Sequence, residues 1–176
     1  LVRVAAPTGK VITARTKPRL LTHHAVLRDG EVQIDGRPWD SSEALQWIRE
    51  AAGPGAILER TQLPTFDILP LLVMTDGAIA SLGYDRRRFR PNLLIGGVEG
   101  LAEREWEGRR LRIGEVLIQM EDLRGRCVMT TFDPDTNQQN SEVLRRIVRE
   151  LDGTLGLNSR VLAGGVVRVG DPVTLI

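Results

Sequence analysis

The sequence predicts a mainly β fold with a few helices, of the α+β class. Short runs of β-branched and aliphatic residues, separated by glycine-containing turns, recur along its 176 residues. Few stretches carry the apolar period of a helix. The hydrophobic fraction of 41% and the charged fraction of 27% are ordinary values for a globular domain with a real core. We therefore expect a compact β-barrel decorated by two or three helices.

The N-terminal third predicts short strands, tight turns and one helix. Asp29-Gly30 and Asp35-Gly36 are hairpin-turn signals. Asp40, with Glu43 three residues later, predicts a capping box for a helix that ends at Gly53-Pro54. Strands are expected at residues 11–13, 25–27, 32–34 and 57–58.

The remainder predicts buried strands and two further helices. A short helix follows Thr75-Asp76-Gly77 and ends near Gly83, and a longer one begins at Asn140 or Ser141 and closes at Gly153. Strands are expected at residues 71–74 and 92–95, in a hairpin over 111–120, and as a pair within 161–176 around Gly170-Asp171-Pro172.

The composition narrows the function classes. A formal net charge of +1 provides no broad attraction to nucleic acid or anionic membranes, so neither partner is expected. The longest apolar runs are far shorter than the roughly 20 residues that span a bilayer, and no signal peptide is visible. A single cysteine excludes an intrachain disulfide, and a reducing cytoplasm is the expected location.

Several familiar active-site types are not indicated by the sequence. His23 and His24 are the only histidines, and on a strand they would point to opposite faces. No Cys/His spacing resembles a zinc site, and there is no Walker loop or dinucleotide-binding glycine pattern.

Two segments remain as candidates. Residues 86–92, Arg-Arg-Arg-Phe-Arg-Pro-Asn, combine guanidinium groups that can grip an anion with a proline that stiffens the loop. On charge alone, a solvated basic loop or an RNA contact is the more common explanation of such a run. Residues 123–134 hold Cys127 among arginines, which favour the thiolate form needed by a nucleophile or a metal ligand. A lone cysteine is also commonly a small buried hydrophobe.

At these two segments the chain resembles the MOSC domain family, which is related to the C-terminal part of molybdenum-cofactor sulfurases. It is similar as well to the mitochondrial amidoxime-reducing component and its bacterial relatives. The matching pieces are Arg88-Phe89-Arg90-Pro91-Asn92, Trp106, Ile113-Gly114-Glu115-Val116, the run from Arg126 to Pro134, Gly156, Asn158, and Val169-Gly170-Asp171-Pro172-Val173.

The resemblance implies a division of the chain into two parts. The motifs keep their order across residues 67–176, which we expect to form a MOSC-type β-barrel. Thr13-Ala14-Arg15 and Pro18-Arg19-Leu20 resemble the end of the β-barrel module that usually precedes this domain. Residues 1–66 are therefore expected to be a partial N-terminal module.

The resemblance also implies a cofactor, the molybdenum cofactor (molybdopterin). Cys127 falls on the functional cysteine, which ligates molybdenum in the reductases and is the proposed persulfide carrier in the sulfurases. Arg90 and Asn92 fall where the family holds the pterin. Arg126, next to the cysteine, is expected to bind the anionic cofactor through its guanidinium group.

Two further positions follow from the resemblance. Arg15 falls on an arginine that reaches the anionic part of the cofactor, and Thr75 on a small hydroxyl residue that lines the pocket. There are also departures. A Lys-Ser pair and a Gly-Asp-Arg element are absent upstream of Thr13, Arg124 replaces a second cysteine of some reductases, and Asn137 replaces the usual glycine. Asparagine tolerates a positive φ at such a position.

Three functions are consistent with this reading. The first is a molybdenum-dependent oxidoreductase that reduces N-hydroxylated or N-oxide small molecules with electrons from a separate reductase. The second is a sulfur-carrier or cofactor-delivery module that uses a persulfide on Cys127, with a cysteine desulfurase as its sulfur donor. The third is a scaffold that has lost the cofactor.

Overall fold

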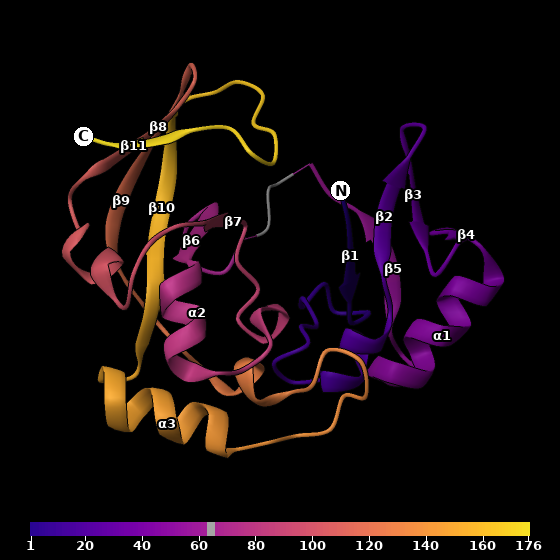
Figure 1. Cartoon of the computed structure of the whole chain (residues 1–176). Helices are drawn as coiled ribbons and strands as arrows, with labels where there is room; N and C mark the ends of the chain where they lie inside the picture. Colours follow the sequence, from indigo (N-terminus) through magenta and orange to yellow (C-terminus); the bar gives the residue numbers. More distant parts are fainter. Residues whose placement is uncertain (63–65) are drawn as a thin grey trace. The chain divides into compact units, whose positions relative to one another are not determined.

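The computed structural model describes the chain except residues 63–65 (Figure 1). Its contacts divide into two compact units, Leu1–Thr65 with Phe132–Gln139, and Phe66–Thr131 with Asn140–Ile176. The expected division into residues 1–66 and 67–176 stays a prediction, and residues 63–65 of that N-terminal part lie outside the described residues. None of the helices in the described part of the chain is long and apolar enough to span a bilayer.

The first unit contains two small antiparallel sheets. One is made of β2 (Ala25–Arg28), β3 (Glu31–Ile34) and β4 (Arg37–Pro38), and the other pairs β1 (Val2–Ala5) with β5 (Ile57–Arg60). The predicted strands at 25–27, 32–34 and 57–58 are therefore confirmed.

The two hairpin turns of the first unit are also confirmed. Asp29 and Gly30 have φ values of 52° and 81°, and Asp35 and Gly36 have 49° and 82°. A two-residue turn whose twist matches the strands needs a positive φ at both central positions, which aspartate tolerates and glycine adopts freely.

Two predictions in the first unit are wrong. Residues 11–13 form no strand beyond one isolated bridge between Val11 and Ala5, because the carbonyl of Thr13 accepts hydrogen bonds from the amides of Thr16 and Lys17 and turns the chain. The helix cap is not Asp40. Ser41 caps α1 (Ser42–Ala52), and its hydroxyl accepts from the Ala44 amide at 3.2 Å.

The helix α1 buries one apolar face, as its period predicted. That face packs against apolar residues of both small sheets and of the turn Pro18–Thr22, among them Ile34, Leu58 and Leu20. The helix ends at Gly53, whose amide donates to the Arg49 carbonyl. The core of this unit is Ile34, Ala44, Ile48, Ala52 and Ala56.

The second unit is built on one six-stranded sheet, which curls into a nearly closed barrel (Figure 1). Its order is β11-β8-β9-β10-β6-β7, and every neighbouring pair is antiparallel except β6 with β7. The strands are β6 (Leu71–Thr75), β7 (Leu93–Ile95), β8 (Arg110–Ile113), β9 (Val116–Gly125), β10 (Thr154–Ala163) and β11 (Val173–Leu175).

The parallel pair is joined through α2 (Asp76–Leu82), which ends at Gly83 with a left-handed φ of 64°. The start of this helix lies very close to a loop. A Cβ added at Gly77 would lie 2.2 Å from the Val98 carbonyl oxygen, so only glycine fits there. The Asp76 carboxylate holds the same loop, accepting from the amides of Gly97 and Val98 at 2.7 and 3.0 Å.

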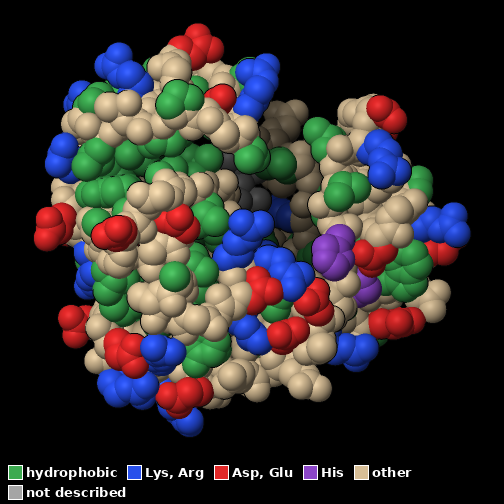
Figure 2. Space-filling view, viewed as in Figure 1, with side chains coloured by type: hydrophobic (Ala, Val, Ile, Leu, Met, Phe, Trp, Pro, Cys, Tyr) green, Lys and Arg blue, Asp and Glu red, His purple; other side chains and the backbone are tan. Residues whose placement is uncertain are grey.

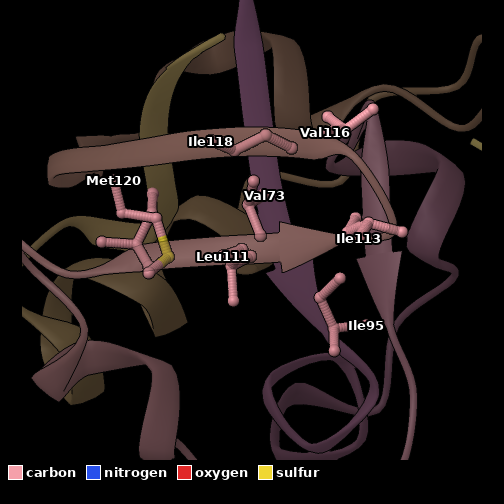
Figure 3. Packing of buried hydrophobic residues seen from close by; sticks show 8 residues of the cluster. Val73, Ile95, Leu111, Ile113, Val116, Ile118 and Met120 are labelled. Atoms are coloured by element: carbon pink, nitrogen blue, oxygen red, sulfur yellow. The ribbon is translucent and has the colours of Figure 1, made fainter. Parts of the chain in front are cut away.

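Both faces of the sheet carry buried apolar side chains. Adjacent residues of β6 point to opposite faces, so Val73 and Met74 belong to different clusters and are both fully buried. Figure 3 shows the cluster around Val73, which contains Val73, Ile95, Leu111, Ile113, Val116, Ile118, Met120 and Leu157. The other cluster packs α2 and α3 (Glu142–Leu151) on the sheet.

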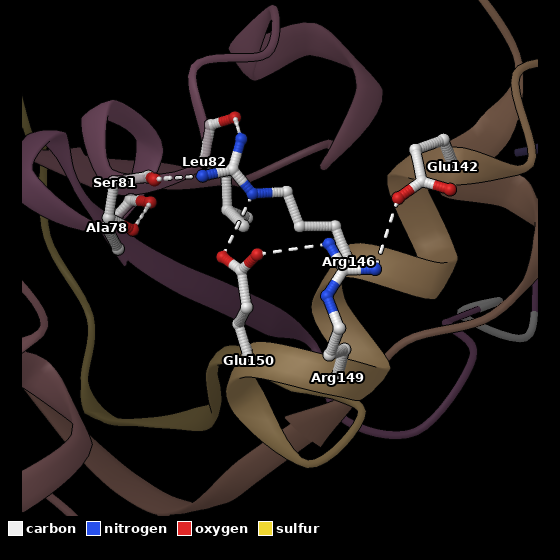
Figure 4. A network of polar contacts seen from close by, with 7 residues as sticks. All are labelled: Ala78, Ser81, Leu82, Glu142, Arg146, Arg149 and Glu150. Atoms are coloured by element: carbon white, nitrogen blue, oxygen red, sulfur yellow. Dashed lines mark hydrogen bonds and ion pairs between the residues drawn. The ribbon is translucent and has the colours of Figure 1, made fainter.

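The α3 helix also holds the end of α2 by hydrogen bonds. Arg146 donates to the backbone carbonyls of Leu82 and Ser81, at 3.0 and 3.2 Å, and to Glu150 (Figure 4). These carbonyls lie at the C-terminus of α2, where a helix favours a cation. Of the two predicted N-terminal residues of α3, Asn140 accepts from the Glu142 amide through its side chain, whereas Ser141 makes no side-chain cap.

The C-terminal strand prediction is partly wrong. The prediction placed two strands within residues 161–176, whereas β10 already begins at Thr154 and β11 is limited to Val173–Leu175. One reason is Gly156, since glycine is unfavourable inside a strand, whereas here it forms an irregularity within the buried part of β10, with a φ of 74°. A Cβ there would lie 2.6 Å from Cγ of Met74. The α+β class itself is confirmed.

Candidate functional site

Cys127 lies where β9 gives way to a short 3₁₀ turn, Val128–Thr131. Its thiol is free and its side chain is partly exposed, so it is not a residue sealed in the core. Its backbone is fixed, because the Cys127 carbonyl accepts from both the amide and the hydroxyl of Thr130, at 3.1 and 3.0 Å. The turn therefore presents the sulfur from a rigid position.

Arg126, the preceding residue, has an unusual environment. Its Nη2 donates to the Phe89 carbonyl, whereas its buried Nε has no hydrogen-bond partner among the described residues. Burial lowers the pKa of Arg126 to about 10, the charges of Arg124 and Arg90 act in the same direction, and Cys127 opposes them. A buried donor without a partner is rare, and a guanidinium in this position is suited to an anion.

The two candidate segments of the sequence meet in the second unit. Arg88 donates from Nη1 to the Thr131 carbonyl at 3.0 Å, and Arg126 bonds to Phe89 in the reverse direction. Phe89 itself is fully buried and anchors this contact in the core. Segments about 40 residues apart in sequence thus form one local cationic region beside Cys127. Elsewhere the visible surface mixes basic and acidic side chains (Figure 2).

Arg90 is exposed and has a φ of 57°, a conformation that is costly for a residue with a side chain. It also precedes Pro91, which restricts its backbone further. Such strain is retained only where the surrounding structure imposes it, and it occurs often at functional sites.

Asn92 has a clear structural role. Its Oδ1 accepts from the Leu72 amide at 2.7 Å, and its own amide donates to the Leu72 carbonyl at 2.9 Å. Asn92 thereby extends the pairing of β6 and β7 by one residue. Its predicted contact with a pterin stays a prediction, and only the Nδ2 end of the side chain is left to make it.

Thr75 is fully buried at the C-terminal end of β6. Its hydroxyl caps α2 by accepting from the Ala78 amide at 3.1 Å, and it donates to Oε2 of Glu103 at 3.0 Å. Its role in lining a cofactor pocket stays a prediction. Arg15 belongs to the first unit, where it is exposed in the turn after Thr13, and its predicted contact with the cofactor is likewise untested.

Sequence reasoning did not assign a role to two residues of this region. Arg124, which was noted among the arginines around Cys127 and in place of a second cysteine, donates to Asn158 at 2.9 Å and to Asp67 at 2.6 Å. Its spacing of two from Arg126, just after the end of β9, was an available signal for these contacts. Glu103, fully buried, lies in a 3₁₀ turn, Ala102–Glu105, that no sequence pattern indicated.

The two histidines belong to the first unit. They are not on a strand, because they lie between the turn Pro18–Thr22 and β2. Both face one carboxylate, with Nδ1 of His23 at 2.6 Å and Nδ1 of His24 at 3.9 Å from Asp35 oxygens. No group of three or more His, Cys, Asp or Glu side chains in the described part of the chain is arranged to hold a metal ion.

Asn137, which replaces the usual glycine of the family, has the positive φ that asparagine was expected to tolerate there. It has a φ of 57° in the loop that follows Asp133, where glycine is usual. The Asp133 carboxylate shapes this loop by accepting from the amides of Asp135 and Thr136, at 3.1 and 2.9 Å.

Comparison with known proteins gives the family of the chain. A family model described as the MOSC domain matches residues 76–174, more than half of the chain. The chain is 32% identical to human "Mitochondrial amidoxime reducing component 2" over 126 residues, covering 61% of this chain and 37% of that protein. It is 29% identical to human "Mitochondrial amidoxime-reducing component 1" over 136 residues, covering 66% and 40%.

A third relative has a different name. The chain is 31% identical to the "Molybdenum cofactor sulfurase" of Drosophila grimshawi over 147 residues, which cover 76% of this chain and 19% of that protein. The chain thus spans well under half the length of each of these three relatives. The matched residues include the cationic region and Cys127, and the chain belongs to the MOSC domain family.

Proposed function

We propose that this protein binds the molybdenum cofactor at Cys127 and reduces N-hydroxylated or N-oxide small molecules. The observation that carries the proposal is the pairing of a free, partly exposed thiol with Arg126, whose buried Nε has no partner among the described residues. A dithiolene pterin phosphate with its metal needs a soft ligand and cationic hydrogen-bond donors, which these neighbours provide.

The proposed role of each site residue follows from the chemistry of its side chain. The Cys127 thiolate would be the metal ligand. Arg126 and Arg90 would hold the anionic part of the cofactor, with Arg15 from the N-terminal unit as a further guanidinium. Asn92 and Thr75 would contact the pterin and line its pocket. Arginine suits an anion here because its planar donors bind oxygens in pairs.

The proposed reaction is balanced as follows. The substrate N–OH group takes up two electrons and two protons, its N–O bond breaks, an N–H bond forms, and water leaves. An N-oxide takes up the same two electrons and two protons, its N–O bond breaks, and the amine and water are the products. When bound, the cofactor supplies a metal able to exchange two electrons and to take an oxygen atom. A separate reductase would deliver the electrons, and the cytoplasm is the proposed location. The guanidinium groups would orient the anionic cofactor.

The names of the relatives support this proposal. Two are called amidoxime-reducing components, which indicates reduction of an N-hydroxylated compound by those proteins. Because the chain spans 37–40% of their length, their activity is carried to this protein as a proposal only.

The decisive measurement is the molybdenum and pterin content of wild type and Cys127→Ala, purified from a host that makes the cofactor. We expect near-stoichiometric metal in the wild type and its loss in the variant. Cys127→Ser should also abolish N-reductive activity with a supplied electron donor. A wild-type protein with neither metal nor pterin, or a Cys127→Ser variant with full activity, contradicts the proposal.

A second function is favoured by the sulfurase match, which covers more of the chain than the two human relatives do. In this alternative, a cysteine desulfurase would transfer sulfur to Cys127, forming a persulfide that is passed on to an acceptor. Cyanide-releasable sulfur on wild type but not on Cys127→Ala, after incubation with a desulfurase and cysteine, would support it. Pterin binding that does not depend on Cys127 would also favour a carrier over a reductase.

A further inference from the structure

Glu103 is fully buried, and its two carboxyl oxygens differ in their hydrogen bonding. Its Oε2 accepts the hydroxyl proton of Thr75 at 3.0 Å, whereas its buried Oε1 has no hydrogen-bond partner among the described residues. An ionised carboxylate needs several donors when it is taken out of water. Glu103 receives one side-chain donor and a hydrogen bond from its own backbone amide, while Oε1 has no partner among the described residues, which is a poor environment for a charge.

The hydroxyl that Glu103 contacts has a structural task of its own. Thr75 Oγ1 accepts from the Ala78 amide at 3.1 Å and so caps α2. A hydroxyl has a single proton, and donating it to Glu103 leaves a lone pair aimed at the helix. Glu103 therefore sets the rotation of the Thr75 hydroxyl, and through it the start of α2.

No charged side chain described around Glu103 forms an ion pair with its carboxyl group. On its own turn, Arg104 is the charge that acts on it, but the Arg104 guanidinium donates to Thr154, and Glu105 is exposed. From α2, the Asp76 carboxylate is bound to the amides of Gly97 and Val98.

The remaining elements packed there add no compensating charge. β6 carries no charged residue, and Arg160, the charged residue of β10, pairs with Glu121. Burial raises the pKa of Glu103, and this effect exceeds the opposing hydrogen bonds and the charge of Arg104. The dipole of the short helix α2 favours an anion at its start, but its effect is smaller than the cost of burying a carboxylate.

We propose that Glu103 keeps its proton in the folded protein to higher pH than an exposed glutamate does, and that it is the positioning residue for Thr75 at the start of α2. The relevance of Thr75 to a cofactor rests on the proposed function, whereas the state of Glu103 does not. Loss of the Glu103 proton would then change how the Thr75 hydroxyl is held at the start of α2. This is the part of the second unit that is expected to face the cofactor.

The sign of the pH dependence follows from the burial. The native protein keeps a proton that the unfolded chain releases, so the free energy of unfolding falls as the pH rises above the ordinary glutamate value of 4.5. It levels off once the pH exceeds the raised pKa of the native state. At pH values below 4.5 this contribution is fully present.

The direct experiment is a carbon NMR titration of the glutamate side-chain carboxyls, with Glu103 assigned by its absence in Glu103→Gln. We expect a midpoint above 4.5, and a still higher midpoint in Thr75→Val, because the hydroxyl proton stabilises the ionised form. A midpoint at or below 4.5 overturns the proposal.

Unfolding by denaturant at several pH values checks the consequence. Glu103→Gln keeps the shape and an acceptor oxygen without the charge, so its stability should lose the decline with pH that wild type shows. Glu105→Gln, exposed on the same turn, is the matched control and should retain that decline. A Glu103→Gln variant with the wild-type decline contradicts the proposal.

Positioning is tested separately by hydrogen exchange of the Ala78 amide, which Thr75 caps. Exchange should be several-fold faster in Glu103→Ala and close to wild type in Glu103→Gln. Equal acceleration in both variants contradicts the positioning role. None of these measurements uses the cofactor, so their failure is distinguishable from failure of the proposed function.

Discussion

Arg126 donates a hydrogen bond to the backbone carbonyl of Phe89, and this contact joins the residue before Cys127 to the core of the second unit. Because Phe89 is fully buried and Arg90 follows it, the bond also determines where the arginine loop lies relative to the thiol. The Nε of Arg126, a further donor of the same guanidinium, is buried and has no partner in the described part of the chain.

The contacts of Arg126 predict that its replacement weakens cofactor binding but hardly changes the stability of the protein. Arg126→Met removes a poorly compensated buried charge but also loses the bond to Phe89, so the free energy of unfolding of the cofactor-free protein should change by about 1 kcal/mol or less. Pterin content after purification should fall roughly tenfold, because charge-assisted bonds to the anion are lost. Arg112→Met, at an exposed position of β8, is the control and should change neither quantity. Unchanged pterin content in Arg126→Met would remove Arg126 from the site.

The contacts of Asn92 predict that Asn92→Ala destabilises the protein and that the conservative variant Asn92→Asp does so much less. Asn92→Ala leaves the Leu72 amide without its acceptor, and we expect a cost of about 1–2 kcal/mol in the free energy of unfolding. Asn92→Asp retains the acceptor oxygen and should recover most of this loss. If Asn92→Asp recovers stability but not pterin content, Nδ2 contacts the cofactor. Denaturant unfolding measures the free energy of unfolding of each variant. If Asn92→Asp were as destabilised as Asn92→Ala, the acceptor oxygen for the Leu72 amide would not be the source of the stability.

Gly77 predicts a steric penalty at the start of α2. The added methyl of Gly77→Ala would lie 2.2 Å from the Val98 carbonyl oxygen, so the helix and the loop must separate, at a cost of about 3 kcal/mol. Gly164→Ala is the matched control, since its methyl meets nothing within 4 Å, and it should change stability by less than about 0.5 kcal/mol. Thermal and denaturant unfolding measure both, and equal effects would contradict the steric explanation.

Arg146 predicts that α3 stabilises α2 through its C-terminal carbonyls. Arg146→Ala removes the donors to Leu82 and Ser81, and we expect a loss of about 1–2 kcal/mol (Figure 4). Arg145→Ala, next to it on the same helix, loses only an exposed pair with Glu142 at 4.0 Å and should cost less than about 0.5 kcal/mol. Hydrogen exchange at the end of α2 should be faster in Arg146→Ala alone.

The sequence by itself was sufficient for the features that depend on near neighbours. Asp29-Gly30 and Asp35-Gly36 predicted their turns because backbone freedom is a property of the residues in the turn. The apolar period predicted α1 and α3, and the motif around Cys127 predicted the family. It also identified both segments of the cationic region, since arginine and cysteine reveal their chemistry without a structure.

Only the tertiary structure decided the features that depend on distant residues. Gly156 stands inside β10 because Met74, far away in sequence, leaves no space there for a side chain. The role of Glu103 depends on Thr75, 28 residues before it, and the cap made by Arg146 depends on carbonyls 64 and 65 residues earlier. Burial and hydrogen-bond partners are properties of the packed chain, whereas local sequence determines only which backbone conformations and periods are favourable.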